Sequence, residues 1–285
     1  MGARIRVRRV RLAGYGRMAG ALSVPVLALA GLANRFDLMP IYAVLPALLA
    51  GFLLAISALV LAIFALTVIW QKGGRGAGSA VAGVIYAMPG LLLAAMAVFA
   101  IFAYPRLVDV TTNAGDPPIF RVLPPHSASA DGAGKGGPPV EIVGIAARLY
   151  PVGIDPVYAA ITGIVADRGW RVAQNIAPAG ETRTARIEAM VTTLLFAFKD
   201  DVAIRLIETA EGTRVDMRSA SRWGQHDLGQ NGRRIRAFMG DLDLAMQGLF
   251  TEFEEPAEEH VDEPDEGASE GPGEEPAGNP ADGGI

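Results

Sequence analysis

Two long apolar stretches constrain this 285-residue chain more than any other feature of its sequence. They run from Ile41 to Trp70 and from Ser79 to Tyr104, and neither contains a charged residue. A helix needs about 20 apolar residues to cross the roughly 30 Å of a bilayer's hydrocarbon core. Both stretches exceed that length, and both end on an aromatic residue of the kind that favours the membrane interface. The sequence therefore predicts two membrane-spanning helices.

A third apolar stretch, Met18–Ala33, is shorter and lies between Arg17 and Arg35. It is either a short spanning helix or the core of a signal peptide with a weak Ala28-Leu29-Ala30 cleavage pattern. The predicted organisation is a basic N-terminus at residues 1–17 and a membrane region at 18–104, with spans at 18–34, 41–70 and 79–104.

The charges of the chain predict its orientation. The net charge is +8 for residues 1–104, zero for 105–251 and −13 for 252–285. The arginines of the N-terminus, together with Lys72 and Arg75, remain in the cytoplasm under the positive-inside rule. Everything after Tyr104 is then extracytoplasmic, whether the first stretch spans or is cleaved. We expect a multi-pass protein of the bacterial inner membrane; a two-span hairpin with the first stretch on the surface is the alternative.

Residues 105–251 have the pattern of an extracytoplasmic α+β domain. Asp155-Pro156 begins a helix that Gly169 ends, and a second helix runs from about Gly232 to Phe250. Four strands are predicted between them, at 170–176, 184–193, 202–209 and 213–222. This order predicts a two-layer domain with an antiparallel sheet of about four strands and two helices. Because they are poor in hydrophobic residues, two segments are predicted to be a flexible insert and a disordered acidic tail, at 124–139 and 252–285.

The last two predicted strands are joined by a tight turn. With Glu211-Gly212 as the turn residues, the hairpin places Arg205 opposite Arg218 and Asp201 opposite Arg222. Two arginines that face each other repel and require an anion between them. Because carboxylates of the chain are available, an internal ion network is the default interpretation, and a one-residue slip of the register would scatter this arrangement.

The segment Arg218–Arg236 has the highest density of polar chemistry in the chain. One interpretation is structural: Arg218 and Arg222 pair with carboxylates, and Asp227 and Asn231 cap the final helix. The carboxylates available for these pairs are Asp201, Asp216 and Glu188.

A second interpretation is an anion-binding pocket. Arginines in the first turn of a helix are locally unfavourable, and Gly224, Gly229 and Gly232 would let backbone amides approach an anion. An anionic lipid, an envelope polymer or a partner membrane protein would be the ligand. The residues of this anion-binding or structural network are Arg205, Arg218, Arg222, Arg233, Asp201, Asp216, Ser219, Ser221, Asp227 and Asn231.

A third interpretation is an envelope hydrolase that uses Ser219, Ser221, His226 and Asp227. The chain lacks a Gly-x-Ser-x-Gly nucleophile motif in this segment, and His226 adjoins Asp227 in sequence, so we assign no catalytic residue. The chain has no cysteine and three dispersed histidines, which predict neither a metal site nor a cofactor. A neutral, extracytoplasmic domain also excludes nucleic acid as a partner.

The C-terminal domain resembles the domain-of-unknown-function 1499 family over roughly residues 109–244. The resemblance rests on Asp109-Val110-Thr111-Thr112, Pro117-Pro118, Phe120, Gly169-Trp170, Ile187-Glu188-Ala189, Phe198, Asp200-Asp201, Arg205 and the segment Arg218–Arg236. It implies a short domain that is often fused to a few membrane spans, and it implies no catalytic assignment. The insert at 124–139 is longer than the family's usual spacing.

Overall fold

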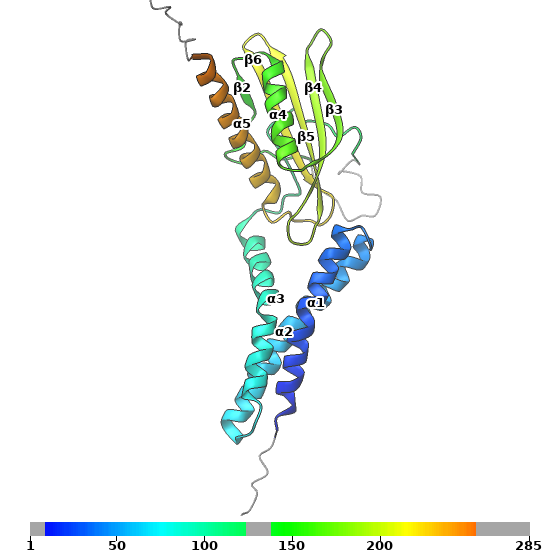
Figure 1. Cartoon of the computed structure of the whole chain (residues 1–285), viewed down its shortest axis with the longest axis vertical. Helices are drawn as coiled ribbons and strands as arrows, with labels where there is room; N and C mark the ends of the chain where they lie inside the picture. Colours follow the sequence, from blue (N-terminus) through cyan, green and yellow to red (C-terminus); the bar gives the residue numbers. More distant parts are fainter. Residues whose placement is uncertain (1–8, 124–137, 255–285) are drawn as a thin grey trace, which may run out of the picture.

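The computed structural model describes residues 9–123 and 138–254. Three long helices form one end of an elongated molecule, and an α+β domain forms the other end (Figure 1). The acidic tail from residue 255 onward, most of the predicted insert and residues 1–8 lie outside the described residues.

The three N-terminal helices are α1 (Arg11–Arg35), α2 (Ile41–Lys72) and α3 (Ala77–Ala103), and each is long and apolar enough to cross a membrane. α1 extends beyond the predicted apolar stretch Met18–Ala33 at both ends, since the helix begins at Arg11 and ends at Arg35. It packs against both other helices, and Gly20 lies so close to the backbone of Gly83 that a side chain would collide there. Small residues of this kind allow membrane helices to approach closely. α1 is therefore an integral part of the helix bundle.

The two basic segments of the helical region meet at the end that is remote from the domain (Figure 1). The backbone amide of Val10, just before α1, donates to the carbonyl of Arg75 between α2 and α3 at 3.0 Å. Arg11, Lys72 and Arg75 therefore lie at the same end of the helix bundle.

The prediction of an α+β domain with an antiparallel sheet is confirmed, but the predicted number of strands is wrong, since the sheet has six strands. β1 and β2 were missed because each has only three residues, too few to show an alternating pattern; both pair with β6. The strands follow the order β1-β6-β5-β4-β3, and β2 lies beside β6 off this path. Their bounds are β1 Asp109–Thr111, β2 Arg148–Tyr150, β3 Arg171–Ala179, β4 Thr184–Thr192, β5 Lys199–Thr209 and β6 Gly212–Ser221.

Helices α4 (Ile154–Asp167) and α5 (Gln230–Glu254) cover one face of this sheet (Figure 1). α5 extends beyond the predicted end at Phe250. The apolar residues of both helices pack against alternate residues of β4, β5 and β6 to form the main core. Its largest fully buried members are Phe238, Ile154, Ile161, Ile187, Ile204, Leu206, Met217, Ile235, Met239, Leu242 and Met246.

The second face of the sheet is covered by a strip of chain, residues 112–123, instead of by helices. Phe120 and Leu123 of this strip pack on Ala203 of β5 and Ala220 of β6. Alternate residues of β5 and β6 point to the same face as these alanines, and most of them are charged. We call this surface the charged face.

The domain contacts the three apolar helices through the loops at the end of the sheet that faces them (Figure 1). The side-chain amide of Asn34, near the end of α1, donates to the carbonyl of Phe196 at 2.7 Å. Lys199 pairs with Asp37 in the loop between α1 and α2. These contacts fix the β4–β5 loop, residues 193–198, against the top of the helix bundle.

Candidate functional site

The β5–β6 hairpin has a different register from the one that its sequence predicted. The turn residues are Ala210 and Glu211, and Thr209 pairs with Gly212. Gly212 therefore begins β6, where its φ of 127° and the close approach of the Tyr150 backbone from β2 exclude a side chain.

In the observed register Arg205 lies opposite Asp216 and Arg218 lies opposite Ala203, so the predicted pair of facing arginines is wrong. The predicted pair of Asp201 and Arg222 is also not directly opposite, since Asp201 faces Ala220. The shift amounts to two residues, so each side chain keeps its face of the sheet.

Three arginines of the predicted network are held by carboxylates on the charged face. Arg205 of β5 donates to Asp116 and Asp216, both at 2.8 Å. Arg218 of β6 forms a two-pronged pair with Asp109 at 2.9 and 2.6 Å. Arg222, just after β6, binds Asp201 in the same way, with both bonds at 2.8 Å. Such bidentate pairs are among the strongest polar contacts in proteins.

Two of the four carboxylates were outside the set expected from the sequence. Asp109 opens β1, and Asp116 lies in the covering strip, about a hundred residues before the arginines that they bind. The family motif that begins at Asp109 was the one signal in the sequence that pointed to this residue.

Glu188 does not take part in the arginine pairs that were expected for it. Its carboxylate is fully buried and accepts hydrogen bonds from the backbone amides of Arg121, Val122 and Leu123 at 2.7, 3.1 and 3.2 Å. Glu188 therefore holds the covering strip onto the charged face. The strip also stacks Phe120 under the Arg218 guanidinium, 4.9 Å from the ring centre.

The N-terminus of α5 is already occupied by a carboxylate of the chain. Asp227 accepts from the amides of Gly229 and Asn231, both at 2.8 Å, as a helix-capping side chain does. Gly229 packs against the ring of Tyr104 and Gly232 against Ile142. These two glycines make room for side chains of the protein, so they do not form the anion pocket considered from the sequence. Asn231 is not a cap.

Asn231 instead lies in a buried polar cluster between β6 and α5. Its amide donates to Ser221 at 3.1 Å, and its oxygen accepts from Ser219 at 2.8 Å and from Arg234 at 2.8 Å. Arg234 also donates to Asp200 at 2.5 Å. Burial raises the pKa of Asp200, and Arg234 partly opposes this shift.

Arg234 was missed in favour of Arg233, although helical periodicity distinguishes the two residues. Arg234 precedes the core residue Phe238 by four positions and so faces the sheet with it. Arg233 is exposed; its guanidinium lies 5.0 Å from the ring centre of Tyr104 and donates to the carbonyl of Leu228.

The residues of the hydrolase interpretation do not assemble into a triad. Nδ1 of His226 accepts from the amide of Leu228 at 3.0 Å, and Nε2 lies 3.3 Å from the carbonyl oxygen of Ile101. Both ring nitrogens are thus engaged by the backbone, while Ser219 and Ser221 bond within the Asn231 cluster. In the described part of the chain, no group of three acidic or histidine side chains is placed to hold a metal ion.

Arg186 of β4 differs from the other arginines of the charged face. It forms no ion pair with a carboxylate among the described residues, whereas the others do. It lies directly opposite Arg205, and its Nε, like those of Arg205 and Arg214, is buried there without a hydrogen-bond partner. Burial lowers the pKa of Arg186, and the nearby charges of Arg121 and Arg205 lower it further, while the carboxylate of Glu188 partly opposes this shift. Sequence reasoning missed this residue, which lies two positions before Glu188 on the same face.

Comparisons with known proteins agree with the motifs noted in the sequence. Residues 109–242 match the family described as "Protein of unknown function (DUF1499)". No curated protein matches the chain. Among solved structures, that of TTHA0849 from Thermus thermophilus aligns at 12% identity and a TM-score of 0.20, over 36% of this chain and 96% of that chain. A TM-score this low does not show a shared fold. The family match confirms the resemblance of the C-terminal domain to the DUF1499 family.

Proposed function

We propose that this chain is a multi-pass protein of the bacterial inner membrane whose extracytoplasmic domain binds an anionic component of the envelope. Three apolar helices support the membrane assignment. The meeting of the basic segments at the end remote from the domain supports the orientation, because such segments stay in the cytoplasm. The domain acts as a binding module and has no catalytic role.

Arg186 carries the binding proposal. Arg205, Arg218 and Arg222 of the charged face pair with carboxylates, whereas Arg186 forms no ion pair within the described ranges and its Nε is buried there without a hydrogen-bond partner. A buried polar atom without a partner costs about 1–3 kcal/mol, more when it is charged. The cost is offset when an anion binds there, and Arg121 and Arg205 add positive potential to the same place, which the carboxylate of Glu188 reduces in part. The ligand is an acidic polymer or an acidic segment of a partner protein.

The alternative of an envelope hydrolase receives no support from the geometry. General base catalysis needs a histidine nitrogen within hydrogen-bond reach of the nucleophile. Both nitrogens of His226 are engaged by backbone groups at the junction with α3 and α5. This histidine positions a loop.

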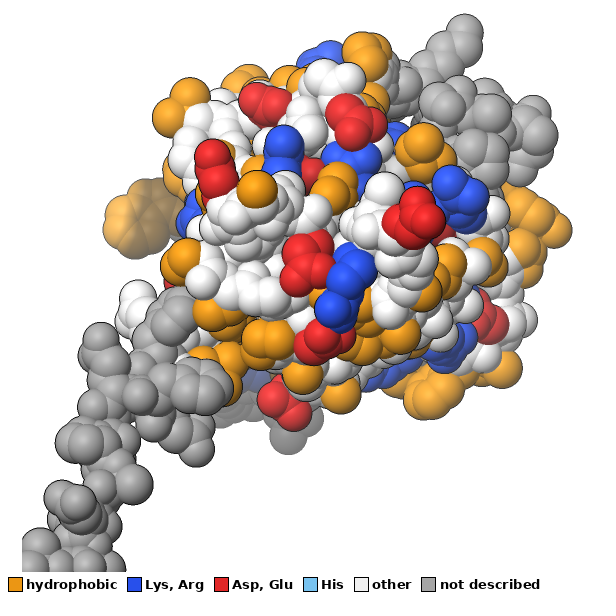
Figure 2. Space-filling model, turned by 90° about the horizontal axis from the view of Figure 1, so that it is seen from above, with side chains coloured by type: hydrophobic (Ala, Val, Ile, Leu, Met, Phe, Trp, Pro, Cys, Tyr) orange, Lys and Arg blue, Asp and Glu red, His pale blue; other side chains and the backbone are white. Residues whose placement is uncertain are grey.

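Nucleic acid is also a poor ligand for the domain. The end of the domain that is remote from the helices carries acidic and basic side chains interspersed, without a continuous basic surface (Figure 2). A protein that binds nucleic acid through phosphates presents clustered Lys and Arg. We therefore propose an anionic ligand that binds at one place on the domain, and not a nucleic acid that binds along its surface.

Substitution of Arg186 tests the binding proposal. We expect Arg186→Gln in the full, detergent-purified chain to weaken binding of inorganic polyphosphate about tenfold, the loss expected for one charged hydrogen bond. Arg168→Gln is the matched control, since it removes the same charge from a residue that pairs with Asp241 and packs beside Trp170 and Phe238. A preference for poly-L-glutamate over polyphosphate would identify an acidic protein as the ligand. Equal binding by both variants, or no binding of either probe by the parent, would sink the proposal.

Single cysteines test the orientation, because the chain has none of its own. In intact spheroplasts, a membrane-impermeant maleimide should label Glu211→Cys in the β5–β6 turn and leave Gln71→Cys at the end of α2 unlabelled until the cells are lysed. The reverse pattern would place the domain in the cytoplasm.

A further inference from the structure

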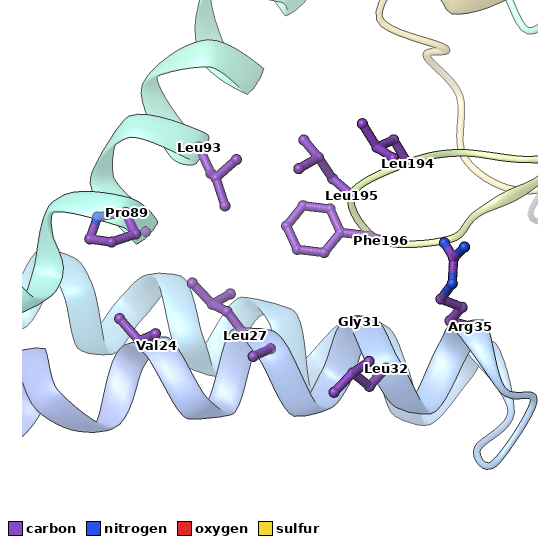
Figure 3. A pocket seen from close by; sticks show the side chains of 12 residues that line it. Val24, Leu27, Gly31, Leu32, Arg35, Pro89, Leu93, Leu194, Leu195 and Phe196 are labelled. Carbon is purple, nitrogen blue, oxygen red and sulfur yellow. The ribbon is translucent and has the colours of Figure 1, made fainter.

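The β4–β5 loop reaches into the space between α1 and α3. Figure 3 shows Leu194, Leu195 and Phe196 pointing between these two helices. The loop is firmly attached: Phe196 packs edge-on against Phe52 of α2, with ring centres 6.1 Å apart, and its carbonyl accepts the bond from Asn34. Gly31 of α1 lies against the carbonyl of Leu195, where a Cβ would be 3.4 Å from the oxygen.

An apolar cavity lies on each side of this loop. One, of about 420 Å³, is bounded by the loop, by α1 and by the middle of α3 around Pro89 and Leu93. The other, of about 300 Å³, is bounded by the loop, by the outer half of α3 and by Leu228. They share Leu93 and the three apolar residues of the loop, so they form one apolar surface around it. Each has the size of a small-molecule site, about 300–1,000 Å³.

The loop leucines require an apolar neighbour that the described protein does not supply. Leu194 is 86% exposed and Leu195 is 60% exposed. Burying one leucine side chain is favourable by about 1.5–3 kcal/mol. Leu194 and Leu195, which project between hydrophobic helices, gain this free energy of burial if hydrocarbon surrounds them.

One arginine lies at the rim of each cavity. Arg35 ends α1 beside the larger cavity, and Arg233 lies beside the smaller one. Both are exposed, and within residues 9–123 and 138–254 neither forms an ion pair with a carboxylate. Both guanidinium groups can therefore bind an outside anion at this surface. A lipid phosphate provides a bidentate partner.

We propose that the surface around the β4–β5 loop is a binding site for an anionic membrane phospholipid. The acyl chains lie in the two apolar cavities, and the rim arginines Arg35 and Arg233 bind the lipid phosphate. The bound lipid covers Leu194 and Leu195 and joins the domain to α1 and α3. This inference rests on the membrane insertion proposed above, and it does not depend on the anion at Arg186, since the two sites share no residue.

Lipid retention by the full chain tests this site. The detergent-purified chain is titrated with phosphatidylglycerol and, separately, with phosphatidylcholine that has the same acyl chains, and bound lipid is counted by native mass spectrometry. We expect tighter retention of phosphatidylglycerol. Arg35→Gln and Arg233→Gln should each weaken it about tenfold and leave phosphatidylcholine unaffected. Leu93→Trp, which fills the shared wall, should weaken both lipids.

Arg168→Gln is again the matched control, and it should retain both lipids as the parent does. Equal retention of the two lipids by the parent, or arginine variants that behave like the control, would overturn the site. So would a dimer whose formation displaces the lipid, because a second copy would then be the occupant. Arg35 and Arg233 are exposed, so their variants report on the site even if Leu93→Trp does not fold. Polyphosphate titration of the same samples reports on Arg186 separately.

Discussion

The two faces of the sheet bury their central side chains by opposite means, and the helix face is buried more completely. On the helix face, Ile204 and Met217 are fully buried among apolar side chains of α4 and α5. On the charged face, Asp201 and Asp216 are just as buried, but each is held by an arginine. The apolar face stabilises the domain by removing hydrocarbon from water. The charged face costs desolvation that its ion pairs offset, so it favours one arrangement of the strip more than it adds stability.

Truncation on the helix face should have the largest effect. Phe238 is fully buried and stacks on Trp170, with ring centres 5.5 Å apart. We expect Phe238→Ala to lower the free energy of unfolding by about 4 kcal/mol, because it removes the ring and leaves a cavity. Urea denaturation of the full chain in detergent, read by pulse proteolysis, measures this. Leu244→Ala, at an exposed position of the same helix, is the control. A loss similar to the control's would contradict a core at Phe238.

Breaking an ion pair on the charged face should cost somewhat less. Asp216→Ala leaves Arg205 without its buried carboxylate, and Arg214 also loses its partner. We expect a loss of about 3 kcal/mol, at the lower end for a buried pair, because Arg205 keeps Asp116. The same denaturation experiment applies. Asp116→Ala is the comparison: Asp116 is 71% exposed, so its loss should be far smaller, and equal losses would mean that burial does not set the cost.

The contact between the domain and the helices should respond weakly to pH. The hydrogen bond from Lys199 holds the pKa of Asp37 below its ordinary value of 3.8. A carboxyl whose pKa is depressed contributes its stability above the ordinary pKa and loses it as the pH falls through the depressed value. Hydrogen exchange of the β4–β5 loop should thus be slightly faster in Asp37→Asn than in the parent, equally at pH 5 and pH 7. Asp167→Asn, at an exposed carboxylate of α4, should match the parent; a difference that disappears by pH 5 would refute the assignment.

Removing the unpaired arginine should have the smallest effect on stability. Arg186 forms no ion pair among the described residues. Arg186→Met removes like-charge repulsion from Arg121 and Arg205, and with it an opposing attraction to Glu188. We expect a change of less than about 0.5 kcal/mol, the range of an ordinary surface substitution. A loss as large as that of Asp216→Ala would show that Arg186 has a structural role.

Local patterns predicted most of the elements and little of the candidate site. The helices and the four long strands have enough residues to show their periodicity, which is why α4 and β4 lie close to their predicted bounds. The predicted hairpin turn was wrong by one residue, since Gly212 lies in β6 and not in the turn. Glycine is needed at position 212 because β2 approaches it closely, and no local sequence pattern encodes that approach. The partners of Arg218 and Arg205 were missed for the same reason, since Asp109 and Asp116 are brought to them only by folding.

The sequence by itself determined two long apolar helices, an antiparallel α+β domain and its resemblance to the DUF1499 family, because length, hydropathy and periodicity are properties of contiguous residues. The tertiary structure alone decided which arginines are neutralised. Charge pairing acts across space, over a few ångströms, and two positions adjacent in the chain can differ completely in their neighbours. Arg234 is thus bound to Asp200 within the domain, while Arg233 beside it lies at the apolar helix α3, next to Tyr104.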